Sequence, residues 1–418
     1  MRAGDWIAER AAAFPERLAV EDPGTKLTYS ELDAAVARRA QELVEAGAVA
    51  GATVPVEQPA SADFAVELHA LNRLGAVAFP LDPRLAAAER RAALEAAGHE
   101  GGEELLCRIL TSGSTGTPRA IGLTPANFLW SAAGSALNLG VEPADRWLCC
   151  LPLFHVAGVS ILTRSAIYGT TAVVHDGFDP DHVARALAED EITLVSLVAT
   201  QLARLLDTGG DVSRPRAILL GGGPLPLELL ERATAAGATV VQTYGMTETC
   251  SQVATLAPAD ARRKLGSAGR PLLTAKIEID DGEIVVSGPT VAPGSLGPDD
   301  RLHTGDLGEI DDDGFLWVTG RKSEIIVSGG ENVMAAEVEA VLLRHPTVAD
   351  VAVVGRPDSE WQEAVTAIVV PAEGESPDEG ELHTYSTSLL APFKVPKHFE
   401  FVEELPRTAA GKLKRADL

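Results

Sequence analysis

The apolar residues of this chain gather in short, nearly continuous runs, which are separated by longer segments with helical spacing. Such runs occur at 76–81, 105–110, 146–151, 193–198 and 216–220. A strand with one exposed face would alternate apolar and polar residues, so these strands are buried on both faces. The pattern therefore predicts an α/β fold in which parallel sheets are sandwiched by helices.

The helical spacing is clearest near the N-terminus, where apolar positions recur at Val36, Ala40 and Val44. This recurrence every three to four residues predicts an amphipathic helix. Ser30 precedes it and is a residue type that caps helix N-termini. A second helix is expected around residues 66–71.

The pattern changes after Lys276 to short alternating strands with Asp and Gly at their turns. This texture predicts a small antiparallel β subdomain at about 267–320. A chain of 418 residues is long for one core, which favours two domains. We place them at 1–321, which includes the β subdomain, and at 322–418.

Composition is that of an ordinary globular protein, with 46% hydrophobic and 23% charged residues. The N-terminal charges precede no apolar stretch, and no 18-residue apolar window occurs, so we expect a cytoplasmic protein without a membrane span. The formal net charge of −25 disfavours nucleic acid and anionic membranes as partners. The four cysteines lack C-x-x-C spacing, which favours reduced core thiols over metal ligands or disulfides.

A loop of small hydroxyl residues and glycine follows the run 105–110. It consists of Thr111, Ser112, Gly113, Ser114, Thr115 and Gly116. Its many N–H and O–H donors and its lack of bulky side chains suit a polyphosphate, because the backbone can approach anionic oxygens closely. Taken alone, such a stretch is more often a plain flexible loop. Four further motifs in a fixed order favour the phosphate interpretation.

The first of these motifs follows the apolar run 216–220, and the second comes about twenty residues later. Gly221, Gly222 and Gly223 leave room for a flat ring such as adenine, although a turn that requires positive φ is the simpler alternative. In the second motif, Tyr244 offers a stacking face and Thr247 a hydroxyl for phosphate. The next residue, Glu248, offers a hard carboxylate oxygen for Mg²⁺.

The last two motifs lie in the C-terminal third. Asp306 can accept two ribose hydroxyls, with a β-turn aspartate as the alternative. Arg321 could supply a second ribose or phosphate contact. Lys412 lies in a polar loop after Gly411. A single lysine in such a loop is usually only solvated, so Lys412 is a candidate site residue only because the other motifs are present.

The order of these segments resembles the adenylate-forming superfamily of acyl-CoA synthetases, amino-acid adenylation domains and luciferases. The likeness covers nearly the whole chain. It implies a large N-terminal AMP-binding domain and a small, mobile α+β C-terminal domain. It also implies ATP and Mg²⁺ as cofactors, CoA as co-substrate and a small carboxylic acid as substrate, with a homodimer as an open alternative to a monomer.

The resemblance assigns roles residue by residue. The 111–116 loop would hold the β- and γ-phosphates, while Gly221–Gly223, Tyr244 and Gly245 would bracket adenine. Thr247 would contact the α-phosphate and Glu248 the Mg²⁺, and Asp306 with Arg321 would bind ribose. Lys412 would bridge the substrate carboxylate and the α-phosphate.

A closer likeness is to the o-succinylbenzoate–CoA ligases of menaquinone biosynthesis. It rests on residues 151–158, 219–224 and 242–252, and on 325–333, which related aryl-CoA ligases share. Ser196 and Arg204 are candidates for gripping the aliphatic carboxylate of the substrate. His155 is expected at the mouth of the acyl pocket, with a structural core histidine as the alternative.

Several positions depart from the superfamily pattern. Arg119 stands where lysine is usual, which keeps the charge, and Ser323 occupies the hinge position where many relatives have Asp or Lys. The connection before Leu105 and the segment 291–301 are abbreviated, which puts the outer wall of the N-terminal region in doubt.

The expected reaction has two steps, in which the acid is first adenylated and the acyl group then passes to CoA. Because Lys412 and the CoA thiol need the same space, the C-terminal domain would rotate and bring Gly329 and Gly330 to the pantetheine path. Alternatives are a generic aryl- or fatty-acyl-CoA ligase and a catalytically silent nucleotide-binding protein. A P-loop phosphotransferase lacks its G-K-[ST] and a serine hydrolase its G-x-S-x-G. An amino-acid adenylation domain lacks its acid after Phe154.

Overall fold

The computed structural model describes residues 5–98, 104–112, 118–223, 225–359, 361–407 and 413–418. The chain divides into two compact units. Unit 1 comprises Met1–Glu278, Val285–His303 and Gly314–Leu316, and unit 2 comprises Ile279–Ile284, Thr304–Asp313 and Trp317–Leu418. The domain boundary expected at 321/322 stays a prediction, since unit 2 also takes in two short segments from earlier in the chain.

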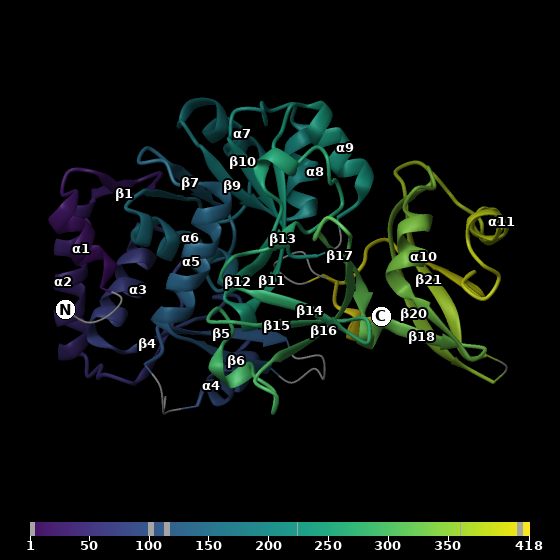
Figure 1. Ribbon diagram of the computed structural model, residues 1–418, viewed down its shortest axis with the longest axis horizontal. Helices are drawn as coiled ribbons and strands as arrows, with labels where there is room; N and C mark the ends of the chain where they lie inside the picture. Colours follow the sequence, from purple (N-terminus) through teal and green to yellow (C-terminus); the bar gives the residue numbers. More distant parts are fainter. Residues whose placement is uncertain (1–4, 99–103, 113–117, 224, 360, 408–412) are drawn as a thin grey trace. The chain divides into compact units, whose positions relative to one another are not determined.

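Unit 1 contains the parallel sheets and the helices that cover them (Figure 1). Its helices are α1 (Trp6–Ala13), α2 (Tyr29–Glu45), α3 (Ala62–Leu74), α4 (Ala87–Ala97), α5 (Pro125–Leu139), α6 (Val156–Tyr168), α7 (Pro180–Glu189), α8 (Ala199–Asp207) and α9 (Leu227–Ala235), with the 3₁₀ turns η1 (Thr247–Thr249), η2 (Pro258–Asp260) and η3 (Pro293–Ser295). Its strands are β1 (Leu18–Asp22), β2 (Thr25–Thr28), β3 (Thr53–Val56), β4 (Val77–Pro80), β5 (Cys107–Ser112), β6 (Pro118–Leu123), β7 (Arg146–Cys149), β8 (Thr171–Val174), β9 (Leu194–Leu197), β10 (Ala217–Leu220), β11 (Val240–Met246), β12 (Ser251–Thr255) and β13 (Arg270–Pro271).

The larger sheet has nine strands in the order β13-β12-β11-β10-β9-β7-β8-β1-β2. Its centre is parallel, because β1, β8, β7, β9, β10 and β11 pair in the same direction. Antiparallel strands close both ends, with β2 at one edge and β12 followed by β13 at the other. The parallel sheet predicted from the unbroken apolar runs is thus confirmed.

Successive residues of these strands point to opposite faces and fill two different cores. In β7, Trp147 and Cys149 join the core that holds residues of α3, α5 and α6, whereas Leu148 joins the core that holds residues of α7, α8 and α9. β10 divides in the same way, with Leu219 in the first core and Ile218 in the second. Both faces of the sheet are therefore buried, which explains why its strands carry no polar face.

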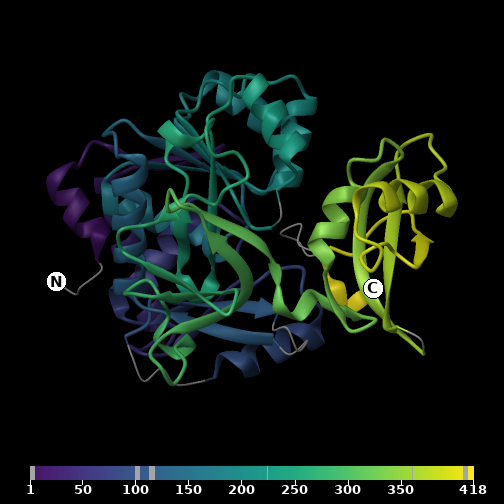
Figure 2. The same ribbon diagram turned by 45° about the vertical axis from the view of Figure 1, so that its right-hand side comes forward.

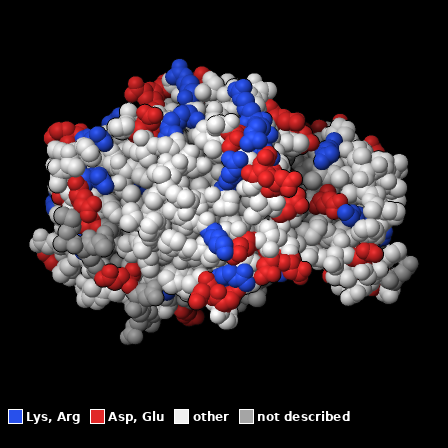
Figure 3. Space-filling view, viewed as in Figure 1, with Lys and Arg blue, Asp and Glu red and all other residues white. Residues whose placement is uncertain are grey.

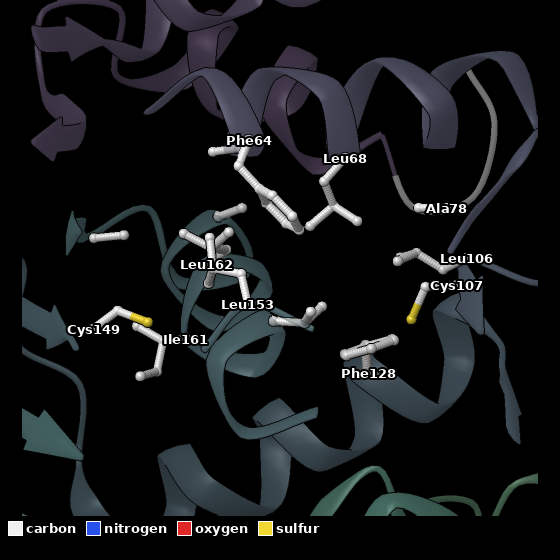
Figure 4. Packing of buried hydrophobic residues seen from close by; sticks show 14 of the residues in the cluster. Phe64, Leu68, Ala78, Leu106, Cys107, Phe128, Cys149, Leu153, Ile161 and Leu162 are labelled. Carbon is white, nitrogen blue, oxygen red and sulfur yellow. The ribbon is translucent and has the colours of Figure 1, made fainter. Parts of the chain in front are cut away.

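The first core also meets a smaller sheet in the order β3-β4-β5-β6. In Figure 4, Phe64 and Leu68 of α3 point toward Leu162 and Leu153, and Phe128 lies near Cys107 of β5. The first two pairings of this sheet are parallel, and β5 with β6 forms an antiparallel hairpin. Helices α3, α5 and α6 thus supply the apolar layer between the two sheets.

The amphipathic helix near the N-terminus begins slightly earlier than the sequence indicates. The N-cap of α2 is Thr28 rather than Ser30, because the Thr28 side chain accepts from the Glu31 N–H and the Glu31 carboxylate accepts from the Thr28 N–H. This reciprocal capping box satisfies two N–H groups at once. A lone serine two residues later, inside the first turn, offers neither contact.

Unit 2 holds most of the C-terminal third (Figures 1 and 2). Strands β14 (Lys276–Asp280), β15 (Glu283–Ser287), β16 (Leu302–Ile310) and β17 (Leu316–Arg321) form a four-stranded sheet to which both units contribute residues. After the 3₁₀ turn η4 (Lys322–Glu324) come β18 (Ile325–Ser328), β19 (Glu331–Met334), α10 (Ala335–Leu342), β20 (Val348–Asp358), β21 (Gln362–Pro371), α11 (Glu379–Leu389), β22 (His398–Phe401) and η5 (Arg415–Asp417). A separate apolar core joins α10 and α11 to β20 and β21, which confirms a small α+β region at this end.

The four cysteines are buried and free of disulfides, as expected for core thiols. Burial raises the pKa of the Cys149 thiol to about 12, which keeps it protonated and unreactive. Within the described residues, no helix combines the length and the apolar composition needed to cross a bilayer. On the face shown in Figure 3, Lys and Arg side chains alternate with Asp and Glu, and no broad basic patch is visible.

His69 of α3 makes the stability of unit 1 depend on pH. It is 5% exposed and lines a cavity of about 10 Å³ with Tyr29 and Ala65, and burial lowers its pKa to about 4. Because the unfolded chain binds this proton near pH 6.5, the free energy of unfolding should fall by about 3 kcal/mol between pH 6.5 and pH 4. Urea unfolding of the His69→Leu variant should lack this component of the pH dependence. The matched variant is His182→Leu at an exposed histidine, and an unchanged pH slope in His69→Leu would contradict the assignment.

Candidate active site

The end of β11 forms a tight reversal that contains four of the predicted site residues, namely Tyr244, Gly245, Thr247 and Glu248. Strand β11 runs through Tyr244 and Gly245 to Met246, and η1 with Thr247 and Glu248 follows at once. The chain returns as β12, with Met246 paired to Ser251. Tyr244, Thr247 and Glu248 are all half-buried, so their side chains lie at an accessible surface of unit 1.

The reversal is held by a buried hydroxyl and by unusual backbone angles. The Thr249 hydroxyl accepts from the Met246 N–H at 2.9 Å, and the Cys250 N–H donates to the Thr247 carbonyl at 3.0 Å. Cys250 and Ser251 both have positive φ, at 51° and 84°. Left-handed backbone at two consecutive non-glycine residues is costly and is typical of functional turns. The Glu248 carbonyl is fixed as well, since it accepts from the Ala292 N–H at 2.7 Å.

Gly245 is required by the closeness of the two strands. A Cβ at this position would lie 1.7 Å from the Ser251 carbonyl oxygen. No side chain could be accommodated without moving the returning strand. The glycine of the Tyr-Gly pair is therefore structural in addition to any contact with a nucleotide.

The triple glycine follows β10, which is the sheet neighbour of β11. A Cβ on Gly221 would lie 2.9 Å from Thr243 Cγ2 and 3.0 Å from the Thr243 carbonyl oxygen, whereas one on Gly223 would meet nothing within 4 Å. Gly222 has φ of +92°. The simple alternative, a turn that needs positive φ, thus holds at Gly222, while Gly223 offers open space of the kind a flat ring could occupy. The carboxyl ends of adjacent parallel strands are also where ligands bind in such sheets.

The expected phosphate loop connects β5 to β6. Thr111 pairs with Arg119 and Ser112 with Pro118, and the Thr111 hydroxyl donates to the Arg119 carbonyl at 3.2 Å. Gly113, Ser114, Thr115, Gly116 and Thr117 lie outside the described residues. Arg119 is exposed. A strand pair of this register brings Thr111 and Arg119 to the same end of the hairpin.

His155 is the N-cap of α6 and is half-buried. Its ring lies 4.8 Å from that of Phe154, tilted by 53°. The Gly158 N–H and the Val159 N–H donate to its carbonyl, which fixes the backbone at the start of the helix. The histidine is thus neither fully buried nor freely exposed, and both of its expected roles stay predictions.

The two candidates for gripping the acid differ in burial. Ser196 of β9 is buried, and its hydroxyl accepts from Trp147 Nε1 at 3.0 Å. Arg204 of α8 is exposed, and its guanidinium lies 5.5 Å from the ring of Phe178. No described contact joins Ser196 to Arg204, so a shared grip on one carboxylate stays a prediction.

Arg164 is a buried cation that the sequence analysis missed. It is 3% exposed, lies 5.7 Å from the ring of Trp147, and donates to the Ser131 hydroxyl at 3.0 Å, while its Nε finds no partner in the described part of the chain. Burial lowers its pKa. Ser131 in turn donates to the Cys250 carbonyl at 2.7 Å, so the guanidinium supports the reversal after β11. The signal for it was that it is the single charged residue of helix α6.

Unit 2 holds the predicted ribose pair. Asp306 of β16 and Arg321, the last residue of β17, form an ion pair with 2.9 Å between Oδ1 and Nε. The Asp306 N–H donates to the Thr304 hydroxyl at 3.0 Å, which orients the aspartate. A carboxylate held in this way can accept vicinal hydroxyls, and the guanidinium beside it balances its charge.

The remaining predicted residues lie further along unit 2. Ser323 is exposed in η4, and Gly329 with Gly330 turns β18 into β19 at φ of +60° and +84°. The Gly329 N–H donates to the Trp361 carbonyl at 2.8 Å, and a Cβ there would lie 3.0 Å from the indole. Lys412 and Gly411 lie outside the described residues. Their segment is bounded by a bridge between Arg407 and Leu413.

The described residues have the chemistry needed to bind the Mg²⁺ and the nucleotide that the resemblance implies. The half-buried Glu248 carboxylate at the reversal supplies an oxygen of the kind Mg²⁺ prefers, and the open space at Gly223 suits a planar base. The described residues contain no cluster of three or more His, Cys, Asp or Glu that could hold a metal by itself. A carboxylate with few protein partners is typical of Mg²⁺ that is bound together with substrate phosphates.

Two glycine variants separate the structural from the ligand-contacting role. Gly245→Ala should unfold or inactivate the protein, because its methyl group would overlap the Ser251 carbonyl. Gly223→Ala should leave the melting temperature within about 2 °C while raising the KM for ATP, since its methyl group would intrude only on a bound base. Thermal unfolding and ATP titration measure both effects. A normal KM in Gly223→Ala would remove this glycine from the nucleotide site.

Comparison with known proteins places these features in a family. The chain matches the AMP-binding enzyme model over residues 7–101 and 99–296, and the AMP-binding enzyme C-terminal domain over 337–412. It is 39% identical over 478 aligned positions to a 2-succinylbenzoate–CoA ligase of Bacillus licheniformis, and the alignment covers 99% of each chain.

Solved structures agree in fold. The o-succinylbenzoate CoA synthetase (MenE) of Bacillus subtilis in complex with its acyl-adenylate intermediate has a TM-score of 0.92 at 38% identity, covering 99% of this chain and 97% of that one. The same enzyme with ATP and magnesium ion gives 0.91 at 37% identity, covering 99% of each chain. Because the family matches span most of the chain, it belongs to the AMP-binding enzyme family.

Proposed function

We propose that this chain is an ATP-dependent acid–thiol ligase, which converts 2-succinylbenzoate to 2-succinylbenzoyl-CoA in menaquinone biosynthesis and works in the cytoplasm. The observation that carries this proposal is the near full-length likeness to a synthetase solved with its acyl-adenylate, at 38% identity. Two described features have the chemistry that binding of ATP requires. They are the reversal after β11 with Tyr244, Thr247 and Glu248, and the Asp306–Arg321 ion pair.

The first step makes an activated acyl group, because the oxide of a carboxylate is a very poor leaving group. A substrate carboxylate oxygen attacks the α-phosphorus of ATP, the bond to the β-phosphate oxygen breaks, and pyrophosphate leaves. Two anions must approach for this to happen. Lys412 and Arg119 offset the repulsion, each by up to about 4 kcal/mol at 4 Å for an effective dielectric near 20. Mg²⁺ held by Glu248 supplies further positive charge when bound.

The second step transfers the acyl group. The CoA thiol attacks the acyl carbonyl, the bond to the AMP oxygen breaks, and AMP leaves, while the thiol proton passes to solvent. Rotation of the C-terminal domain at Ser323 withdraws Lys412 and brings Gly329 and Gly330 to the pantetheine path. The open surroundings of Gly330, with nothing within 4 Å of a Cβ, support this use of the turn.

The acid pocket is proposed around Ser196, with His155 at its mouth. The aliphatic carboxylate of the substrate would be bound by the Ser196 hydroxyl together with an arginine guanidinium. Arg204 is the exposed candidate and Arg164 the buried one, and Trp147 touches both Ser196 and Arg164. A buried cation whose Nε has no partner among the described residues favours an anionic ligand, since desolvated charge requires compensation.

Separating the two half-reactions tests the mechanism. Lys412→Ala should slow adenylate formation about 1000-fold, as expected for the loss of about 4 kcal/mol. Chemically supplied acyl-AMP with CoA should still give thioester, because the lysine is absent from the second step. The matched control is Lys414→Ala, an exposed lysine two residues further on. Equal failure of both half-reactions, or of neither, would contradict the role of Lys412.

A panel of acids tests the substrate. Release of AMP and pyrophosphate should be stimulated far more by o-succinylbenzoate than by benzoate, acetate or fatty acids. Arg164→Gln and Arg204→Gln should then be compared, since loss of a charged hydrogen bond to the aliphatic carboxylate costs roughly 10- to 100-fold in kcat/KM. The variant that loses activity with o-succinylbenzoate but not with benzoate identifies the gripping cation. A preference for simple aryl or alkyl acids would favour a generic acyl-CoA ligase, and ATP binding without turnover would favour a silent nucleotide-binding protein.

A further inference from the structure

One carboxylate in unit 2 is almost fully buried and has no role in the proposed reaction steps. Glu283 is the first residue of β15 and is 7% exposed. Its Oε1 accepts from the Gly305 N–H at 2.8 Å, and its Oε2 accepts from Lys322 Nζ at 2.8 Å. A buried carboxylate needs such partners, because desolvation of an unpaired charge is costly. What matters here is where these two partners lie in the chain.

The first partner belongs to β16, the strand that carries Asp306. Gly305 immediately precedes Asp306 and has φ of +73°. The same segment of β16 is held a second time by β15, because the Thr304 hydroxyl donates to the Ile284 carbonyl at 2.6 Å and accepts from the Asp306 N–H. Residues 283 and 284 therefore fix the two residues that lead into the aspartate.

The second partner belongs to the strand end that carries Arg321. Lys322 follows Arg321 directly, and Arg321 pairs with Asp306 at 2.9 Å. The contacts thus close a ring that runs from Glu283 through Gly305 and Asp306 to Arg321, and through Lys322 back to Glu283. The carboxylate raises the pKa of Lys322 through their hydrogen bond, which keeps this lysine charged.

We propose that Glu283 is a positioning residue for the nucleotide ribose, since it joins the β16 segment that carries Asp306 to Lys322 and thereby sets the geometry of the Asp306–Arg321 pair. The proposal rests on the ribose role that the proposed function gives to that pair. Through its contact with Lys322, Glu283 also fixes the chain on the N-terminal side of Ser323. A rotation of the C-terminal domain then begins at Ser323, while Lys322 stays attached to β15.

Nucleotide binding tests the proposal without any need for turnover. Glu283→Gln keeps an acceptor for the Gly305 N–H but weakens the contact with Lys322, and Lys322→Met removes the ammonium. Each variant should weaken AMP binding about 10-fold, as expected for loss of a charged hydrogen bond. Binding of 2′,3′-dideoxy-AMP should change little, because it lacks the hydroxyls that Asp306 would accept. The double variant should be no weaker than either single one, since both remove the same contact.

Two controls keep the result decisive. Lys322→Arg should restore AMP binding to within about 3-fold, and Lys276→Met removes an exposed lysine that pairs with Glu278 on β14 and should have no effect. If Glu283→Gln fails to fold, Lys322→Met carries the test alone, because Lys322 is 45% exposed. Equal loss of AMP and of the dideoxy nucleotide, unchanged AMP binding, or multiplicative effects in the double variant would overturn the proposal. Failure of the proposed function would show instead as wild-type protein that binds AMP normally but activates no acid.

Discussion

The site depends on how closely the chain can fold back on itself after β11. Gly245 lets the Ser251 carbonyl come within a distance that excludes any side chain, and the Thr249 hydroxyl satisfies the backbone inside the bend. Two consecutive residues with positive φ then return the chain as β12. This strained geometry is tolerated because Ser131 and Arg164 brace it from α5 and α6. Tyr244, Thr247 and Glu248, which are expected to meet adenine, the α-phosphate and Mg²⁺, all lie on this one bend.

Much of the fold could be predicted because its rules are local. Runs of apolar residues indicated the parallel strands, and β7, β9 and β10 lie within the runs that predicted them. The nucleotide motifs could be found because each consists of neighbours in sequence, as in the segment from Tyr244 to Glu248. The cap of α2 was placed two residues late, since serine and threonine are both good caps and only the Glu31 contact distinguishes them.

The contacts that join distant segments could not be predicted from the sequence. Ser131 and Cys250 are 119 positions apart, and the hydrogen bond between them exists only because α5 packs beside β12. Glu283 and Lys322 illustrate the same difficulty. In the sequence each is one charged residue among many, and their contact exists only because β15 and the end of β17 lie close together in the fold. The division into units likewise follows tertiary packing. Strands β14 to β17 come from one continuous stretch and form one sheet, yet their residues are divided between the two units. Sequence patterns find side chains that act on a ligand more readily than side chains that hold them in place.

The alternation of strand residues between two cores has a consequence for how this chain could have become shorter than its relatives. The alignment with the Bacillus licheniformis ligase spans 478 positions, against 418 residues here. Removing one residue from β9 would turn Ser196 away from Trp147 and exchange every apolar neighbour in that strand. A deletion that keeps this packing is therefore expected in a connection between elements rather than inside a strand. In this fold the lengths of the connections can vary, whereas the number of residues in each buried strand is fixed by the packing on its two faces.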